Sequence, residues 1–162
     1  MKRRDKNNYY LDIAEEVSRR CTCLRRHYGA VIVKDDEIIS TGYVGAPRRR
    51  KNCTDIKSCV REEKNIAHGE RYELCRSVHA EANAIISASR KDMIGGFLYL
   101  VGIDMDTKSY TQNAACCSMC KRLVINAGIA KVYVRDDKDN YRVVDVEDWI
   151  INDESLDGTF GY

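Results

Sequence analysis

The apolar side chains of the N-terminal part follow first a helical and then a strand-like pattern. Residues 9–26 carry apolar positions at roughly helical spacing, with glutamate and arginine between them. Two short runs rich in β-branched residues follow at 29–33 and 38–42, and the polar residues 34–37 separate them. Apolar residues three or four apart indicate a helix, whereas short β-branched runs around a polar turn indicate a hairpin. The pattern therefore predicts a helix followed by a β-hairpin.

The C-terminal part alternates between the two patterns. Residues 79–90 and 118–127 have helical spacing, and the second of these segments ends at a glycine. Each is followed by a compact apolar run, at 97–101 and 129–134. Strands that alternate with helices usually lie parallel in one sheet, with the helices packed on its faces. We therefore expect an α/β fold, a three-layer α/β/α sandwich whose mixed central sheet begins with the N-terminal hairpin.

Three segments fit this scheme less closely. Residues 45–78 have the weakest periodicity and are rich in cysteine and arginine, and an irregular insert of this length in a compact domain usually has a function. Residues 102–115 exceed a short strand-to-helix connection and would suit a lid or an oligomer contact. Residues 141–146 fit an edge strand and 147–151 a helical turn. Because no linker-like composition separates these segments, we expect residues 1–162 to form one domain.

Composition and charge limit the class of protein. The 162 residues carry 27 lysines and arginines against 25 aspartates and glutamates, and this near balance argues against a protein built mainly to coat nucleic acid. No apolar run approaches the roughly 20 residues of a membrane helix, and the basic N-terminus lacks the apolar core of a signal peptide. We therefore expect a cytoplasmic protein without membrane or nucleic-acid partners. In a reducing compartment, its eight cysteines are more typical of metal binding than of disulfides.

Two short motifs bring metal-binding side chains to the starts of predicted helices. His79-Ala-Glu81 opens the first helix, and Cys117-Ser-Met-Cys120 opens the second, 38 residues after His79. The imidazole and two thiolates supply three zinc ligands, and a catalytic zinc site keeps its fourth position for water. The cysteines are three residues apart and so share a helix face, at a helix start that favours thiolates. The sequence therefore predicts a catalytic zinc held by His79, Cys117 and Cys120.

Glu81 is the expected general acid and base of this site. Zinc lowers the pKa of a bound water toward about 7, and a carboxylate beside that water can carry its proton to the substrate and then to the leaving group. A lone His-x-Glu pair means little, and a lone Cys-x-x-Cys pair would fit a redox or structural role equally well. The combination, with each motif at a helix start, favours a catalytic metal over those alternatives.

Six motifs follow one another in a fixed order between about residues 9 and 135. They are Gly29-Ala-Val-Ile-Val33, Gly42-Tyr-Val-Gly-Ala-Pro47, Gly69-Glu-Arg-Tyr-Glu-Leu-Cys75, His79-Ala-Glu-Ala-Asn-Ala-Ile85, Cys117-Ser-Met-Cys120 and Ile125-Asn-Ala-Gly-Ile129. In sequence and order they resemble the deoxycytidylate deaminase family of the cytidine and deoxycytidylate deaminase superfamily. The pattern of His-x-Glu followed by Cys-x-x-Cys is also the general signature of zinc-dependent base deaminases.

The resemblance implies a fold and an activity. It implies a cytidine-deaminase-type sandwich, one catalytic zinc ion, and hydrolysis of dCMP to dUMP and ammonia. It further implies a homo-oligomer, a dimer or a hexamer, and regulation by dCTP and dTTP, which tune many members. The Asn-Ala-Ile segment after the His-Ala-Glu motif is more similar to nucleotide deaminases than to tRNA adenosine deaminases.

Two positions depart from the family pattern. Cys116 stands where the family usually has proline, but its place breaks the two-residue spacing, so Cys117 is the expected ligand. Val44 stands where the family's asparagine contacts the sugar 3′-hydroxyl, and valine has no polar atom to offer. Because losing such a contact can change substrate choice, the alternative substrates are another cytosine nucleotide or a nucleoside. A non-catalytic nucleic-acid-binding protein on the same fold is the other alternative, against which the intact Glu81 argues.

Arginines supply the candidates for a phosphate site. The run Arg48, Arg49 and Arg50 fits either a phosphate site or a solvated charge run, since arginine offers paired donors to phosphate oxygens. Arg90 is a further candidate, and the resemblance would equally place it at an allosteric or subunit contact. The sequence does not rank the remaining candidates, Arg25, Arg26, Arg61, Arg71 and Arg76.

Four further cysteines would complete a second zinc site. They are Cys23, Cys53, Cys59 and Cys75, and four thiolates suit a closed structural site. The resemblance supports this hypothesis, because some members carry a second zinc built from similar positions. His68 could replace one of the four, and Cys21 is a spare. Buried free thiols are the alternative, since cysteine is among the most often buried residue types.

Overall fold

The computed structural model describes residues 1–154, and five strands of this part pair into one mixed sheet. Residues 155–162, the end of the expected domain, lie outside the described residues. The sheet has the order β2-β1-β3-β4-β5, in which only β3 and β4 are parallel neighbours. The strands are β1 (Arg26–Lys34), β2 (Glu37–Tyr43), β3 (Phe97–Asp104), β4 (Lys131–Arg135) and β5 (Tyr141–Asp145).

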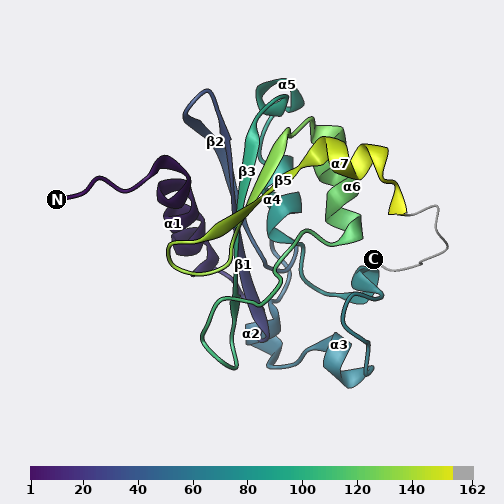
Figure 1. The fold of residues 1–162 in the computed structure, drawn as a ribbon. Helices are drawn as coiled ribbons and strands as arrows, with labels where there is room; N and C mark the ends of the chain where they lie inside the picture. The colour runs from purple at the N-terminus through teal and green to yellow at the C-terminus, as the bar shows by residue number, and fades with distance from the viewer. Residues whose placement is uncertain (155–162) are drawn as a thin grey trace.

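Helices cover both faces of this sheet (Figure 1). Helix α1 (Lys6–Ser18) packs on one face against β1 and β3. On the other face lie α4 (Ala80–Ile86) and α6 (Ser118–Ala127), and α7 (Val146–Ile151) packs against α6. The short α5 (Arg90–Met93) leads into β3. The three-layer α/β/α sandwich predicted from the sequence, with its mixed sheet and N-terminal hairpin, is confirmed.

Two glycines of the hairpin allow the helices to approach the sheet closely. A Cβ atom on Gly29 would lie 2.0 Å from the carbonyl oxygen of Ala14 in α1. A Cβ atom on Gly42 would lie 2.2 Å from the carbonyl oxygen of Ala80 in α4. Both distances exclude any side chain, so each glycine is a packing requirement of its face. Gly42 in particular sets the start of α4 directly against β2.

The two faces have cores of different chemistry. The α1 face holds an aromatic cluster that includes Tyr10, Tyr99 and Tyr133, with the rings of Tyr99 and Tyr133 stacked at 4.7 Å. The α4/α6 face packs small and aliphatic side chains, with several alanines and cysteines among them. Because these side chains are small, α4 and α6 pack close to the sheet and to each other. The first turns of the two helices therefore lie near each other.

Two predicted helices are shorter than expected. The predicted 9–26 helix corresponds to α1, which begins after its cap Asp5 and ends at Ser18. The apolar spacing of the predicted helix extends to Cys21. In the structure, however, Cys21 lies in the loop after α1, where it is buried and its thiol donates to the carbonyl of Tyr28 at 3.0 Å. The predicted 79–90 helix likewise ends at Ile86, and α5 forms a separate turn. In the first of these helices, the spacing of Cys21 in the sequence fitted a helix although the residue lies in a loop.

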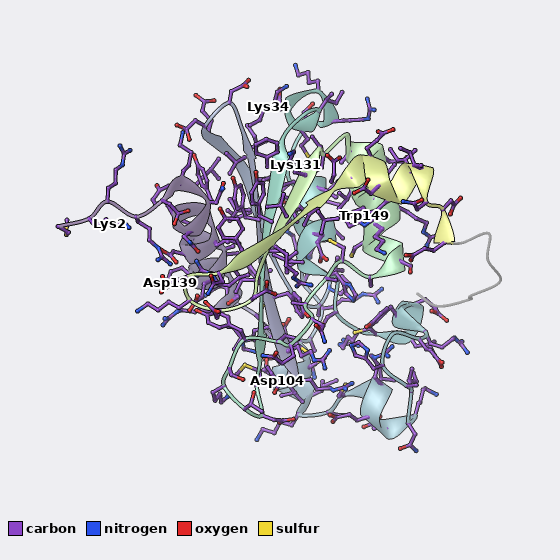
Figure 2. All side chains as sticks on the ribbon, viewed as in Figure 1. Lys2, Lys34, Asp104, Lys131, Asp139 and Trp149 are labelled. Atoms are coloured by element: carbon purple, nitrogen blue, oxygen red, sulfur yellow. The ribbon has the colours of Figure 1, made fainter. Side chains whose placement is uncertain are left out.

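The insert of residues 45–78 contains three single-turn helices. These are α2 (Cys53–Ile56), α3 (Val60–Glu63) and the 3₁₀ helix η1 (Tyr72–Leu74). The α2 and α3 turns lie at the end of the sheet that Asp104 marks, whereas Lys34 and Lys131 mark the opposite end (Figures 1 and 2). The insert thus lies at the carboxyl end of β3, where ligands usually bind in open α/β sheets. Within residues 1–154, no helix combines the length and the apolar character that a membrane span needs.

Candidate metal centre and active site

The structure brings the three expected zinc ligands together. Nδ1 of His79 lies 3.5 Å from Sγ of Cys117 and 3.4 Å from Sγ of Cys120. The three ligand atoms lie within 4.8 Å of one another, and within residues 1–154 no other group of three potential ligands meets this criterion. One imidazole and two thiolates are donors that zinc prefers, and they leave one tetrahedral position open. The residues present therefore fit a catalytic zinc ion.

The backbone around His79 is held on both sides. His79 is the N-cap of α4, and Cys117 is the N-cap of α6, so the site lies between two helix starts. One residue before His79, Val78 pairs with Gly45, and its N–H donates to the Gly45 carbonyl at 2.7 Å. The side chain of Asn83 donates to the Tyr43 carbonyl at 2.8 Å. These bonds tie the start of α4 to the end of β2.

The three expected ligands shift one another's pKa values. A hydrogen bond from Cys120 lowers the pKa of Cys117 to about 4, and His79 adds to this effect. The pKa of Cys120 is raised instead, chiefly because its proton is shared with Cys117. Burial alone would lower the pKa of His79, but its hydrogen bond with Cys117 and the charge of Glu81 raise it. These contacts favour the thiolate at Cys117, which is the form in which cysteine binds metal.

Glu81 lies beside these ligands in the first turn of α4. Its side chain is buried, and this burial raises the pKa of its carboxyl above the usual range, although the charge of His79 opposes the shift. The buried thiol of Cys116 hydrogen-bonds to Glu81, and burial together with this carboxylate raises the pKa of Cys116 well above its ordinary value. A buried carboxyl with a raised pKa is suited to proton transfer near neutral pH.

These groups open into a cavity of about 450 Å³. That volume lies within the range of small-molecule sites in proteins. His79, Glu81, Cys116 and Cys117 form part of its wall, and the buried Val44 lies in the wall as expected for a residue near the substrate. The structure thus combines a His/Cys/Cys cluster, a buried carboxyl and a space for a ligand at one end of the sheet.

The expected arginine run lies elsewhere. Arg48, Arg49 and Arg50 are exposed and do not line the cavity, although Arg50 lines a neighbouring hollow. Arg90 is exposed on α5, where its Nε donates to the Asn126 carbonyl at 2.7 Å. The arginines that do line the cavity are four that the sequence did not rank: Arg25, Arg26, Arg61 and Arg76.

The four additional cysteines all line the same cavity. Cys53 and Cys59 are buried, whereas Cys23 and Cys75 are partly exposed. Burial chiefly raises the pKa of Cys53 and of Cys75, and the nearby Cys23 raises both further. Their sulfur atoms do not meet the close spacing of the His79 centre. The imidazole of His68 instead contacts Arg26, with Nε2 at 2.7 Å from Nη1.

Sequence reasoning missed several residues of the cavity wall. Tyr28 was predictable, because strand alternation places it on the face of Ala30 and Ile32, which pack against α4 and α6. Residues 111–113 also line the cavity, and the unusual length of the 102–115 segment was their signal. Tyr72 belongs to the Gly69-Glu-Arg-Tyr-Glu-Leu-Cys75 motif, but nothing in the sequence indicated that its ring lines the cavity.

Comparisons with known proteins agree with this geometry. Residues 4–135 match the family described as the cytidine and deoxycytidylate deaminase zinc-binding region. A deoxycytidylate deaminase of Mycobacterium phage D29 is 34% identical over 137 residues, which are 82% of this chain and 95% of that protein. The deoxycytidylate deaminase of Schizosaccharomyces pombe is 33% identical over 85 residues, and the match spans 52% of this chain and 26% of that longer protein.

Solved structures share the fold. The dCMP deaminase of cyanophage S-TIM5 in its apo form has a TM-score of 0.55 at 26% identity, covering 82% of this chain and 84% of that one. The cytidine deaminase of Burkholderia pseudomallei has the same TM-score of 0.55 at 16% identity, covering 89% and 95% of the two chains, and so shows the fold alone. With its family match over most of its length and a His/Cys/Cys centre beside a buried glutamate, this chain belongs to the cytidine and deoxycytidylate deaminase family of zinc-binding enzymes.

Proposed function

We propose that this protein hydrolyses dCMP to dUMP and ammonia. The observation that carries the proposal is the position of Glu81, a buried carboxyl that lines the same cavity as His79 and Cys117. A binding protein that merely reused the fold would have no need of a buried proton-transfer group. The deoxycytidylate deaminase from phage D29, similar over 95% of its length, supports dCMP as the substrate.

The residues of the site divide the chemistry between them. His79, Cys117 and Cys120 hold the zinc ion, which when bound supplies an activated water at neutral pH. Glu81 takes the proton of the attacking water and passes it to N3 of the cytosine ring. It then passes the second proton to the amino group, which leaves as ammonia. Its raised pKa suits this exchange, because a group that accepts and returns protons works best near the ambient pH.

An assay on the zinc-loaded protein tests this proposal. Ammonia release and the absorbance change of uracil formation would be followed with dCMP, CMP, deoxycytidine, dCTP and cytosine. We expect dCMP to be the preferred substrate. Preference for another member of this panel would redirect the proposal to the alternative nucleotide or nucleoside, and no turnover of any of them would favour a non-catalytic role.

We further propose that Arg26, with Arg25 and Arg76 nearby, holds the substrate phosphate. Arg26 begins β1 and lines the cavity, where its guanidinium already contacts His68 at 2.7 Å and Asp104 at 3.9 Å. An arginine held in this way presents its remaining N–H groups in a fixed direction, as bidentate phosphate binding requires. This position is a better candidate than Arg48, because Arg48 is exposed outside the cavity.

Arg26→Gln separates the two phosphate hypotheses. Losing a charge-assisted hydrogen bond should lower kcat/KM for dCMP about 10–100-fold while leaving the slow turnover of deoxycytidine unchanged. Arg48→Gln is the matched control and should change neither substrate. If Arg48→Gln rather than Arg26→Gln erased the preference for dCMP, the loop of Arg48, Arg49 and Arg50 would be the phosphate site after all.

A second zinc ion at Cys23, Cys53, Cys59 and Cys75 is also part of this proposal. These thiols line one cavity, although Cys53 begins α2, Cys59 caps α3, Cys75 caps η1 and Cys23 lies in the loop before β1. Metal binding would draw them together, since its free energy also stabilises the segment that carries the ligands. Metal analysis should then find about two zinc ions per chain, and Cys53→Ser should remove one of them. One zinc in fully active protein would show that the four are free thiols.

Oligomer formation, effectors and location complete the proposal. We infer a homo-oligomer because Ile86 on α4 and Leu123 on α6 are exposed apolar residues on neighbouring helices. Light scattering on the wild-type protein and on an Ile86→Asp variant would test it, with a smaller species expected for the variant. Adding dCTP or dTTP to the activity assay would test regulation, and cell fractionation would test the expected cytoplasmic location.

A further inference from the structure

One buried arginine organises the part of the insert that precedes the active site. Arg61 in α3 is 5% exposed. Its Nη1 donates to the carbonyls of Glu70 at 2.6 Å and Arg71 at 3.0 Å, and its Nη2 donates to the carbonyl of Ala67 at 2.8 Å. A single side chain thus gathers three carbonyls of one turn. Because that turn leads directly into η1, Arg61 fixes where η1 begins.

The same guanidinium lies over an aromatic ring. Cζ of Arg61 is 4.5 Å from the centroid of the Tyr72 ring, a distance at which a cation is attracted to the ring face. Tyr72 is the first residue of η1 and lines the cavity. The position of the Tyr72 ring is therefore set from one side by a buried charge that is itself held by three hydrogen bonds.

The Tyr72 ring also contacts the ring of His79. The two centroids are 5.0 Å apart and the planes meet at 79°, a T-shaped arrangement that aromatic pairs favour. Within residues 1–154, the hydrogen-bond contacts of the His79 ring both involve Nδ1 and the two cysteines. In metal sites, contacts of the imidazole outside the metal bond orient its ligand atom, and the usual contact is a hydrogen bond from the second ring nitrogen. The ring of Tyr72 is the contact that restricts how the His79 ring can rotate here.

We propose that Tyr72, held by Arg61, is a positioning residue that fixes the ring of His79 for metal binding and so couples the insert to the active site. The inference rests on the proposed use of His79 as a zinc ligand. It gives the insert a mechanical role: the fold of residues 61–72 determines how firmly the metal centre is built. The ring of Tyr72 carries this role, whereas its hydroxyl does not.

Two variants at Tyr72 test the inference. The zinc dissociation constant would be measured by chelator competition, together with the visible spectrum of the cobalt-substituted protein and kcat and KM for dCMP. Tyr72→Leu removes the ring and should weaken zinc binding about 10–100-fold, as loss of an orienting partner typically does. It should also shift the cobalt spectrum and lower kcat more than it changes KM. Tyr72→Phe keeps the ring and should retain wild-type values.

Two further variants separate positioning from general loosening of the insert. Leu74→Ala alters the same 3₁₀ helix, but Leu74 faces the neighbouring hollow, so zinc affinity and the cobalt spectrum should stay unchanged. Arg61→Lys keeps a charge but cannot span three carbonyls, and it should weaken zinc binding in the same direction as Tyr72→Leu.

Four results would overturn the inference. They are wild-type zinc affinity and cobalt spectrum in Tyr72→Leu, equal damage in Tyr72→Phe, an equal loss in Leu74→Ala, and wild-type zinc affinity in Arg61→Lys. Wild-type protein that neither binds zinc nor turns over dCMP would overturn the proposed function together with this inference, so the two failures are distinguishable.

Discussion

A buried arginine on one face of the sheet and a buried glutamate on the other have opposite surroundings. On the α1 face, Arg135 is 1% exposed and pairs with Asp12 at 2.8 Å and Glu15 at 3.0 Å. On the α4/α6 face, Glu81 is 4% exposed and faces the cavity beside His79 and the thiol of Cys116. Arg135 is thus neutralised by carboxylates of its own fold, whereas Glu81 has the metal-ligand cluster and an open space as neighbours.

The difference shows that the buried charge has a different role on each face of the sheet. A buried charge with close, hydrogen-bonded partners of opposite charge holds elements together, and removing one member is costly because the others are left unpaired. A buried charge beside a cavity has a shifted pKa and can reach a bound substrate. Such a group lowers the stability of the fold, but it is reactive. The α1 face should therefore respond to mutation in stability, and the α4/α6 face in activity.

The largest effect is expected for Glu81→Gln. The variant should lose about 10²–10⁴-fold in kcat, the usual contribution of a positioned proton-transfer group. Zinc content should stay at the wild-type level, because glutamate is not a ligand, and the melting temperature should not fall. Activity and metal analysis on the same preparation provide the check, with His79→Ala as the contrasting variant that should lose metal. Substantial turnover by Glu81→Gln would remove Glu81 from the mechanism.

Arg135→Met should produce the reverse pattern. It removes the shared partner of Asp12 and Glu15 and should lower the free energy of unfolding by about 1–3 kcal/mol. The effect should be moderate because both carboxylates are partly exposed and can be solvated. Urea unfolding measures it, and kcat per folded molecule should stay within about twofold of wild type. A large loss of kcat at unchanged stability would contradict the division between the two faces.

Asp12 gives the α1 face a pH dependence. Burial opposes ionisation of Asp12, but hydrogen bonds from Arg4 and Arg135 outweigh it and lower its pKa. A carboxyl whose folded pKa lies below its unfolded value of about 3.9 stabilises the protein above that value. This stabilisation is lost as the pH falls through the folded pKa. Asp12→Asn should therefore lower the free energy of unfolding at pH 7 by less than about 1 kcal/mol, since the side chain is half exposed.

A pH series on both proteins checks this expectation. The difference in free energy of unfolding between wild type and Asp12→Asn should be constant from pH 7 to pH 5 and shrink toward pH 3. Glu16→Gln is a suitable control, because Glu16 lies on the same helix and, among residues 1–154, its carboxylate pairs with the exposed Arg19. A difference that grew on acidification would mean that Asp12 is not stabilised as a carboxylate.

The two halves of the metal centre were predictable because each half is local. His79, Cys117 and Cys120 each lie in or beside the first turn of a helix, and sequence spacing alone decides which side chains share a helix end. Alternating strand and helix patterns likewise sufficed for the layers of the sheet. The predicted C-terminal end of the first helix was wrong because Cys21, which fits the helical spacing, is a buried loop residue. Burial of a loop residue follows no regular spacing, so the pattern could not distinguish it from a helical position.

The phosphate candidates could not be ranked in this way. Arg26 and Arg76 are 50 residues apart in the chain and line one cavity only because the insert folds back over the end of the sheet. In sequence, the exposed run Arg48, Arg49 and Arg50 is a stronger signal than either of them. The role proposed for Tyr72 could not be predicted for the same reason, because it depends on a ring contact with His79 that only the fold creates.

Among the variants of the cavity wall, the smallest effect on catalysis is expected at Val44, where the comparison can be sharpened within the active site itself. Val44 is 7% exposed and lines the cavity, and its backbone is fixed by bonds to Tyr28 and Thr22. Val44→Asn would place an amide there without moving the chain. One new hydrogen bond to the sugar should lower KM for dCMP about 2–10-fold.

The stability of Val44→Asn distinguishes a sugar contact from a general change in the site. Without ligand, the new amide lacks an assigned partner, and a buried unsatisfied group costs about 1–3 kcal/mol, so the melting temperature should fall. With dCMP bound, the sugar hydroxyl satisfies the amide, so the stabilisation that dCMP confers should be larger in the variant than in wild type. Val44→Ala, which removes bulk without adding a polar group, should show no such gain. An equal dCMP-induced shift in all three proteins would mean that a residue other than the one at position 44 holds the hydroxyl.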